Sequence, residues 1–172
     1  MSVLIDQLLE LARFESEKIT PALAPCDLIE IINSISSRLD NSLKNGNKSI
    51  ELIKNVSGIV MSDSSMTEIM LENIISNSIK YSPQGSVIKI ELIEDKDILL
   101  CSVTDSGNGI AEDQIPKIFD RFYRVDESRN SQISGKGIGL AIVKRLADLQ
   151  NIPINVQSQV SVGTTFTFRF SR

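Results

Sequence analysis

Apolar residues recur at helical spacing in several separate stretches of this 172-residue chain, and at strand spacing in the stretches between them. Spacings of three and four residues predict helices, because such residues share one helical face. Pro21 and Pro25 bracket a connector after the first helix, and Asp27 and Asp63 are expected to cap the next two. The expected helices span residues 3–18, 27–45, 63–80 and 137–149, with a brief further helix near 112–119.

Runs rich in β-branched and aromatic residues predict strands between these helices. The expected strands span residues 49–54, 58–61, 87–94, 97–104, 154–157 and 164–170. In the last of them Phe166, Phe168 and Phe170 alternate with other residues, which is typical of a strand with one buried face. Residues 120–136 show no sustained period and are expected to form a flexible loop. Helices combined with an antiparallel-rich sheet predict an α/β sandwich.

The chain contains no histidine and only two cysteines, Cys26 and Cys101. Without histidine it cannot form a Ser-His or Cys-His nucleophile pair, nor a zinc site that uses imidazole. The cysteines are too far apart in sequence for a CxxC motif, so we expect a reducing, cytoplasmic setting. A net charge of -4 provides no basic field for nucleic acid, and no apolar run is long enough to span a membrane. We therefore expect contact with neither nucleic acid nor membrane.

One face of the third predicted helix carries Asn73, Asn77 and Lys80 at positions i, i+4 and i+7. Amide oxygens are hard neutral ligands that suit Mg²⁺, and a lysine ammonium can pair with phosphate. The alternative is that these side chains cap neighbouring backbone or face solvent.

Two glycine-containing segments lie at the ends of predicted elements. Residues 105–109 follow a strand, so that Asp105 can accept a hydrogen bond from an exocyclic amine such as that of adenine, while the glycines allow close backbone approach. Residues 135–140 lead into an apolar helix, whose free N–H groups and dipole favour an anion. Their spacing matches neither the Walker nor the Rossmann fingerprint. The alternatives are an ordinary Asp-Gly turn and a flexible helix start.

Residues 119–124 concentrate three of the eight aromatic residues with two arginines. Aromatic side chains can dock a loop onto a core while arginine reaches a phosphate. The same mixture can stack single-stranded nucleic acid, but four cations against three anions in residues 120–136 are too balanced for a groove that follows a phosphate backbone.

These motifs occur in one order, and together they resemble the catalytic, ATP-binding domain of sensor histidine kinases. Residues 72–83 resemble that family's N box, 105–110 its first glycine box, 118–124 its F box and 135–140 its second glycine box. The resemblance covers residues 27–170 and implies the Bergerat fold, a two-layer sandwich with about three helices on one face of a mixed, mostly antiparallel sheet. It also implies that residues 1–20 end the second helix of the dimerisation and phosphoacceptor domain, that 21–26 are a linker, and that 27–172 are the catalytic domain.

The resemblance implies a Mg-ATP site. Asn73 would coordinate Mg²⁺ with Asn77 lining the same site, and Asp105 would read the adenine amine. The other implied ATP contacts are Lys80 and Arg124 at the phosphates, Tyr81 beside the nucleotide, Gly107 and Gly109 at the close approach, Gly135, Gly137 and Gly139 in a mobile lid, and Ile110, Phe122, Lys136, Ile138, Leu140 and Thr164.

The implied activity is phosphoryl transfer from Mg-ATP to a histidine that this chain lacks, so autophosphorylation is not expected from the chain alone. The implied partners are its own dimerisation domain, as a homodimer in the full-length protein, and a response regulator. The alternative is an ATP-gated binding module or pseudokinase adaptor of the same fold. The sequence departs from the family where residues 150–152 replace a frequent His-Gly-Gly, where Ser161 replaces a glycine, and where Ser78 replaces a common alanine.

Overall fold

Five strands form the main sheet of the computed structural model, which describes residues 9, 12, 19–125 and 137–172. These strands are β2 (Ser49–Lys54), β4 (Val87–Asp95), β5 (Ile98–Asp105), β6 (Ile154–Gln159) and β7 (Gly163–Ser171). Their order in the sheet is β2-β4-β5-β7-β6. The pair β2 and β4 is parallel, and every other neighbouring pair is antiparallel. The mixed, mostly antiparallel sheet expected from the sequence is therefore confirmed.

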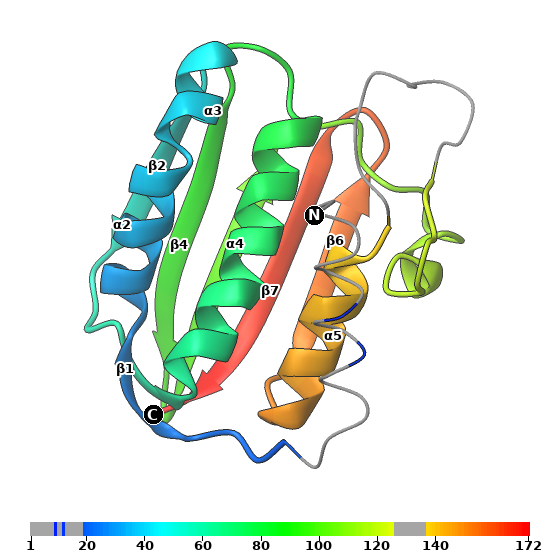
Figure 1. The fold of residues 1–172 in the computed structure, drawn as a ribbon. Coiled ribbons are helices and arrows are strands. Elements are labelled where there is room, and N and C mark those ends of the chain that lie inside the picture. The colour runs from blue at the N-terminus through cyan, green and yellow to red at the C-terminus, as the bar shows by residue number, and fades with distance from the viewer. Residues whose placement is uncertain (1–8, 10–11, 13–18, 126–136) are drawn as a thin grey trace.

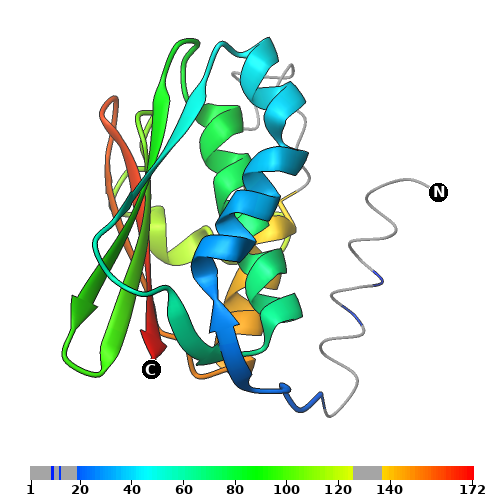
Figure 2. The same ribbon diagram turned by 90° about the vertical axis from the view of Figure 1, so that its left-hand side faces the viewer.

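Three helices cover one face of this sheet (Figure 1). They are α2 (Leu28–Arg38), α4 (Ser64–Tyr81) and α5 (Gly139–Leu149). Figure 2 shows the sheet nearly edge-on, with these helices in a second layer on one side only. The predicted two-layer sandwich is confirmed, and the opposite face of the sheet carries no helix among the described residues.

Aspartate side chains begin α2 and α4, as the sequence predicted. The Ile29 N–H donates to Asp27 Oδ1 at 2.8 Å, and the Met66 N–H donates to Asp63 Oδ1 at 3.1 Å. A carboxylate in this position satisfies an N–H that has no partner within the helix, and it interacts favourably with the positive end of the helix dipole. Local sequence thus determines where both helices begin.

Helix α4 lies at the centre of the core. Its Met70, Leu71, Ile74 and Ile75 are fully buried. Phe166, Phe168 and Phe170 of β7 are also buried, which confirms their predicted alternation. Burying a side chain of this size contributes about 1.5–3 kcal/mol relative to exposure. The core therefore fixes the rotation of α4, and with it the direction in which the polar residues of this helix point.

The single helix predicted over residues 27–45 is wrong, because the chain forms α2 and a separate α3 (Asp40–Asn45). Leu39 interrupts the helix with φ -89° and ψ 3°. Just before this residue, the Ser36 hydroxyl donates to the Ile32 carbonyl at 2.7 Å and the Ser37 hydroxyl donates to the Asn33 carbonyl at 2.9 Å. Serine back-bonding of this kind bends helices, which gives a physical reason for the break.

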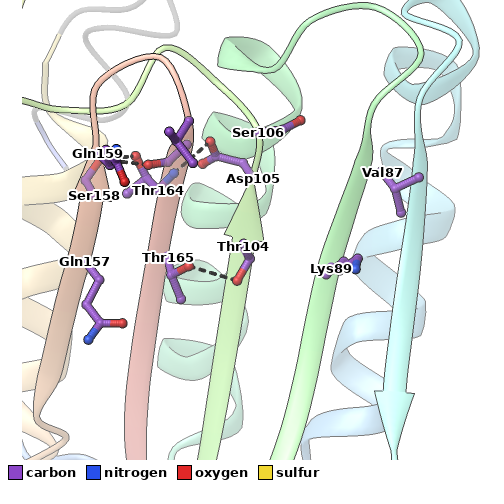
Figure 3. A pocket seen from close by; sticks show the side chains of 12 residues that line it. Val87, Lys89, Thr104, Asp105, Ser106, Gln157, Ser158, Gln159, Thr164 and Thr165 are labelled. Carbon is purple, nitrogen blue, oxygen red and sulfur yellow. Dashed lines mark hydrogen bonds between the residues drawn. The ribbon is translucent and has the colours of Figure 1, made fainter.

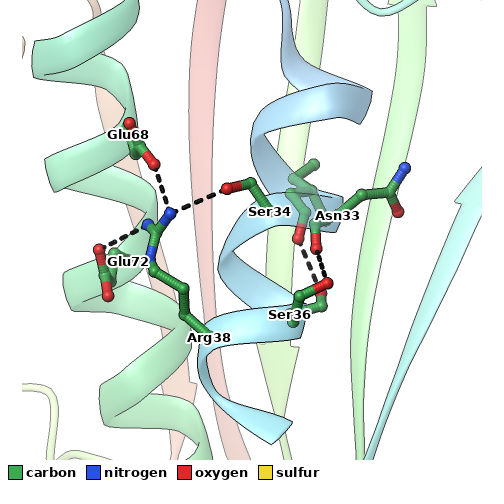
Figure 4. A network of polar contacts seen from close by, with 8 residues as sticks. Asn33, Ser34, Ser36, Arg38, Glu68 and Glu72 are labelled. Atoms are coloured by element: carbon green, nitrogen blue, oxygen red, sulfur yellow. Dashed lines mark hydrogen bonds and ion pairs between the residues drawn. The ribbon is translucent and has the colours of Figure 1, made fainter.

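A polar network joins α2 to α4 (Figure 4). The Arg38 guanidinium pairs with Glu68 at 2.7 Å and with Glu72 at 2.8 Å, and it donates to Ser34 Oγ at 2.8 Å. The Arg38 side chain is 42% exposed, so each pair contributes about 0–1 kcal/mol. The network supplements the apolar contact between these helices.

A second, two-stranded sheet lies beside the main one. It pairs β1 (Ala24–Asp27) with β3 (Ile59–Ser62) in antiparallel fashion, with Cys26 opposite Val60 and both of them buried. The sequence predicted a connector over residues 21–26 and no strand there. A strand that forms only through pairing with a distant segment carries little local signal, which explains the error.

Other predictions are confirmed only in part. The brief helix expected near 112–119 is a short 3-10 helix, η1 (Ile115–Lys117), with Pro116 in its first turn, where proline is tolerated. Of residues 3–18, only Leu9 and Ala12 are described, and both are helical. Of the loop expected over 120–136, residues 126–136 lie outside the described part. No helix among the described residues has the length and apolar character needed to cross a membrane.

Candidate functional site

Three polar residues form one row across the end of the main sheet. Asp105 at the end of β5 is paired with Thr164 of β7, and Thr164 is paired with Ser158 of β6. The next row on the same face, toward the core, consists of Val103, Phe166 and Val156. The polar row therefore marks the place where the apolar core ends beneath the helices. We call it the polar row below.

The Asp105 carboxylate is held from three directions. Its Oδ1 accepts from the Gly107 N–H at 2.8 Å and from the Thr164 N–H at 3.3 Å, and its Oδ2 accepts from the Ser78 hydroxyl of α4 at 3.3 Å. Burial raises the pKa of Asp105, while these three hydrogen bonds stabilise the ionised form and lower it. The position of a carboxylate predicted from sequence is thus fixed by residues of a strand and a helix that are distant in sequence.

Glycines of the first glycine box lie where no side chain fits. A Cβ at Gly107 would lie 2.9 Å from Asp105 Oδ1 and 2.9 Å from the Tyr81 carbonyl oxygen. Gly109 has φ +66°, and a Cβ there would lie 2.0 Å from the Gln159 carbonyl oxygen. Gly109 therefore needs both the left-handed conformation and the missing side chain. At Gly109 the close neighbour is the β6–β7 turn of the chain itself, and the predicted close approach of a nucleotide stays a prediction.

Asn73 of α4 lies against the first residue of α5. Its Nδ2 donates to the Ile69 carbonyl at 2.9 Å, which turns its Oδ1 away from that carbonyl. A Cβ at Gly139 would lie 2.5 Å from Asn73 Oδ1. The structure thus brings the N box and the second glycine box together, with a carboxamide oxygen at the point of contact.

Asn77 and Lys80 follow on α4, and both are half-buried. The Lys80 Nζ donates to the Tyr81 hydroxyl at 3.2 Å and lies 4.7 Å from the centre of the Tyr81 ring. A cation over an aromatic face is stabilised by the ring quadrupole. Lys80 and Tyr81 therefore form one unit at the C-terminal end of this helix.

The F box contacts the second glycine box. The Phe122 N–H donates to the Gly137 carbonyl at 2.8 Å, and a Cβ at Gly137 would lie 2.7 Å from the Phe122 carbonyl carbon. Both residues have positive φ, +62° at Phe122 and +71° at Gly137. Left-handed backbone at an aromatic residue is costly and persists only where the surroundings impose it. Phe122 is 57% exposed. By contrast, Phe119 packs against the core, and the Tyr123 hydroxyl donates to Gln114 Oε1.

The remaining predicted residues divide into two groups. The first group is described by the structure. Ile138 is buried and precedes α5 without a side-chain cap, and Leu140 and Arg124 are half-buried. The Ile110 N–H donates to Ser158 Oγ at 2.8 Å. Gly135 and Lys136 lie outside the described residues, so their predicted roles and that of a mobile lid stay predictions.

A groove of about 520 Å³ opens beside Asp105 (Figure 3). Its floor lies on the helix-free face of the sheet, where Thr104 and Thr165 share a hydrogen bond of 3.0 Å and Lys89 provides a cation. The Asp105 side chain contacts α4 through Ser78, on the other face. The groove therefore borders the polar row, but it lies on the face of the sheet opposite the helices.

Sequence reasoning missed Ser158. Its hydroxyl lies within hydrogen-bond distance of Ile110, Gly163 and Thr164, all of them in or next to predicted motifs. The signal that could have found it is the alternation of β6, which places Ser158 on the same face as Ile154 and Val156. A serine on an otherwise apolar inward face indicates that its hydroxyl makes specific hydrogen bonds.

Residues 62–172 match a protein family described as histidine kinase-, DNA gyrase B-, and HSP90-like ATPase. The chain belongs to this ATPase family. All four motifs recognised in the sequence lie within the matched residues, so the family assignment and the local geometry concern the same part of the molecule.

Individual proteins match nearly the whole chain. The sensor-like histidine kinase SenX3 of Mycolicibacterium smegmatis is 35% identical over 164 residues, which are 95% of this chain and 43% of SenX3. Full-length ShkA in complex with AMPPNP, 23% identical, has a TM-score of 0.84 and covers 98% of this chain and 35% of its own. ThkA in complex with the response regulator protein TrrA, 20% identical, has a TM-score of 0.78 and covers 98% and 47%. The two structures show the fold, and the chain spans less than half the length of the curated relatives it matches.

Proposed function

We propose that this chain binds Mg-ATP and donates the γ-phosphoryl group to a histidine on the dimerisation domain of a sensor histidine kinase. One observation carries the proposal: α4 contacts the two ends of the candidate site. Its Ser78 donates to Asp105, and its Asn73 lies against Gly139. Asn73 and Ser78 are five positions apart, a rise of about 7.5 Å along the helix axis, and one bound nucleotide can bridge such a separation.

The Asp105 end of the site fits adenine. An ionised carboxylate offers about four acceptor positions, and three are used by Gly107, Thr164 and Ser78. The remaining acceptor position suits the exocyclic amine of adenine. Guanine presents a carbonyl oxygen at the corresponding position, which would leave both acceptors unpaired and repelling each other. Asp105 would therefore select ATP over GTP.

The Asn73 end fits a metal-bound phosphate. Within the described residues, no cluster of three or more acidic, cysteine or histidine side chains could hold a metal ion. Mg²⁺ is commonly bound by one or two protein oxygens together with substrate phosphates and water. Asn73, whose Nδ2 is held by the Ile69 carbonyl, would supply the protein oxygen through its Oδ1, with Asn77 lining the same site. Bound Mg²⁺ would neutralise phosphate charge.

The beginning of α5 fits an anion. Ile138 makes no side-chain cap, so the first N–H groups of this eleven-residue helix have no partner from a capping side chain. Such N–H groups together with the helix dipole bind phosphate. Lys80 on α4 and Arg124 after the F box would add positive charge. Phosphoryl transfer depends mainly on such positioning and charge neutralisation.

The phosphoryl acceptor has to come from outside this chain, which contains no histidine. We infer that this histidine lies on the dimerisation domain of the same kinase, and that the full-length kinase acts as a cytoplasmic homodimer. A response regulator would then take the phosphoryl group, an inference supported by the complex of ThkA with TrrA. A chain that bound ATP without donating phosphoryl would instead be the ATP-gated module expected as the alternative.

A calorimetric titration tests nucleotide binding. We expect the chain to bind ATP with Mg²⁺ present, to bind it more weakly with a chelator, and to bind GTP at least about tenfold more weakly, since one unpaired polar contact costs on the order of 1–3 kcal/mol. Absence of ATP binding, or equal affinity for GTP, would contradict the proposal.

A further inference from the structure

We propose that Ser158 is a positioning residue for base recognition, which holds the first glycine box against β7 and so sets the place of Asp105. Ser158 is not one of the hydrogen-bond partners of Asp105, and it acts through Ile110 and Thr164. This inference rests on the proposed ATP-binding function and deepens it, because it names a second residue that determines the choice of base.

The Ser158 hydroxyl uses its full hydrogen-bonding capacity. It lies 2.8 Å from the Ile110 nitrogen, 3.0 Å from the Gly163 carbonyl oxygen and 2.8 Å from Thr164 Oγ1. A hydroxyl donates once and accepts twice. When Ser158 donates to the Gly163 carbonyl, it accepts from both the Ile110 N–H and the Thr164 hydroxyl. One side chain thus ties the end of the first glycine box to the beginning of β7.

The first glycine box is held at both ends by the polar row. At its beginning, the Thr164 N–H donates to Asp105 Oδ1 at 3.3 Å. At its end, the Ile110 N–H donates to Ser158. Between them, the Ser161 N–H donates to the Asn108 carbonyl at 2.8 Å, and Gly109 packs against the carbonyl of Gln159, the neighbour of Ser158. Loss of the Ser158 hydroxyl would release the end of the box while leaving the direct partners of Asp105 in place.

The expected effect is therefore on selectivity. In Ser158→Ala the Ile110 N–H loses its partner, and the backbone that presents Asp105 is less firmly held. We expect ATP affinity to fall about tenfold, the size of one lost hydrogen bond in a part-buried site, and GTP affinity to change little. The ratio of ATP to GTP affinity should fall by the same factor. A serine that served only global stability would lower the melting temperature without changing this ratio.

Matched variants distinguish the effect of the Ser158 hydroxyl from a general effect of changing a residue in this sheet. Ser102→Ala removes another serine of the same sheet, whose hydroxyl pairs with Thr167 at 2.9 Å and contacts no glycine box. It should leave both affinities unchanged. Ser158→Thr keeps the hydroxyl and should retain the selectivity. Ser158→Cys keeps the size but offers only a weak donor and acceptor, and should behave as Ser158→Ala does.

The experiment is a calorimetric titration of each variant with Mg-ATP and Mg-GTP, together with a thermal melt. If the parent chain shows no preference for ATP, the proposed function and this inference both fail. If the parent prefers ATP while folded Ser158→Ala and Ser158→Cys keep the same ratio, only the inference about Ser158 is wrong. If Ser158→Ala does not fold, the comparison of Ser158→Thr with Ser158→Cys decides. Failure of both the alanine and cysteine variants to fold would contradict a positioning role.

Discussion

Asp105 and Thr164 lie directly opposite each other in β5 and β7, and the Thr164 N–H donates to Asp105 Oδ1 at 3.3 Å. The same pair of strands brings Gly163 so close that a Cβ there would lie 2.0 Å from the Asp105 carbonyl oxygen. The carboxylate is therefore built into the end of the sheet, beneath α4, rather than carried on a free loop.

Asp105→Asn should lose the preference for ATP. The variant keeps one oxygen but replaces the other with an amide group, which cannot accept from the adenine amine. We expect ATP affinity to fall at least about tenfold with GTP affinity unchanged or raised, as measured by calorimetry. Asp97→Asn, in the exposed β4–β5 turn, is the matched control and should behave as the parent does. An unchanged ratio in Asp105→Asn would show that this carboxylate does not read the base.

The raised pKa of Asp105 predicts a pH-dependent stability. Folded Asp105 keeps its proton to a higher pH than the unfolded chain does, so between the two pKa values the native state binds more protons. The free energy of unfolding should therefore fall as pH rises through a window that begins near the ordinary value of about 3.9 and ends at the raised pKa. Urea denaturation of the parent and of Asp105→Asn isolates this effect, because only the parent has it. Parallel pH profiles for the two proteins would contradict it.

Asn73 and Gly139 should be coupled energetically. A Cβ at Gly139 would lie 2.5 Å from Asn73 Oδ1 and displace the carboxamide, although alanine normally stabilises a helix by about 0.5–1 kcal/mol relative to glycine. We expect Gly139→Ala to weaken Mg-dependent ATP binding roughly tenfold, and to have little further effect in Asn73→Ala. Calorimetric titration of the parent, the two single variants and the double variant, with and without Mg²⁺, measures this coupling as a double-mutant cycle.

Asn77→Ala provides the comparison for the metal. If Asn73 supplies the protein oxygen, Asn73→Ala should reduce the effect of Mg²⁺ on ATP affinity more than Asn77→Ala does. A larger loss of the Mg²⁺ effect in Asn77→Ala would show that Asn77, and not Asn73, is the metal ligand. Additive losses in Asn73→Ala and Gly139→Ala would show that these two residues act independently.

Gly109 and Gly85 should respond differently to alanine. Both have positive φ, +66° and +79°, but nothing lies within 4 Å of a Cβ at Gly85, whereas one at Gly109 would lie 2.0 Å from a carbonyl oxygen. Gly85→Ala should cost about 1–2 kcal/mol of unfolding free energy from conformational strain alone. Gly109→Ala should cost clearly more and should also weaken ATP binding. If urea denaturation gave the same loss of unfolding free energy for both variants, the β6–β7 turn would have to move aside at little energetic cost.

Features with a local cause could be predicted from the sequence. The caps at Asp27 and Asp63 and the alternation of phenylalanines in β7 depend on neighbouring residues only, and the structure confirms them. The order of the four motifs likewise indicated the family before any geometry was known. Their contacts, such as Asn73 with Gly139, depend on packing of α4 against α5 and had to come from the structure.

Features that depend on distant segments could not be predicted. Strand β1 exists because Cys26 and its neighbours pair with β3, more than thirty residues away. Ser158 gains its role from Ile110, which precedes it by 48 positions. The helix break at Leu39 arises from serine back-bonding, which competes with a strong apolar periodicity in the same segment.

Transfer of a labelled γ-phosphoryl group tests the central claim most directly. The chain is incubated with Mg²⁺, γ-labelled ATP and a separate polypeptide that carries the phosphoacceptor helix of a sensor histidine kinase, with a histidine-to-alanine form of that polypeptide as control. We predict an acid-labile label on the acceptor, formed with release of ADP, absent from the control and strongly reduced when the chain carries Asp105→Asn. Binding of ATP without any label on the histidine would contradict the kinase assignment and favour the ATP-gated module.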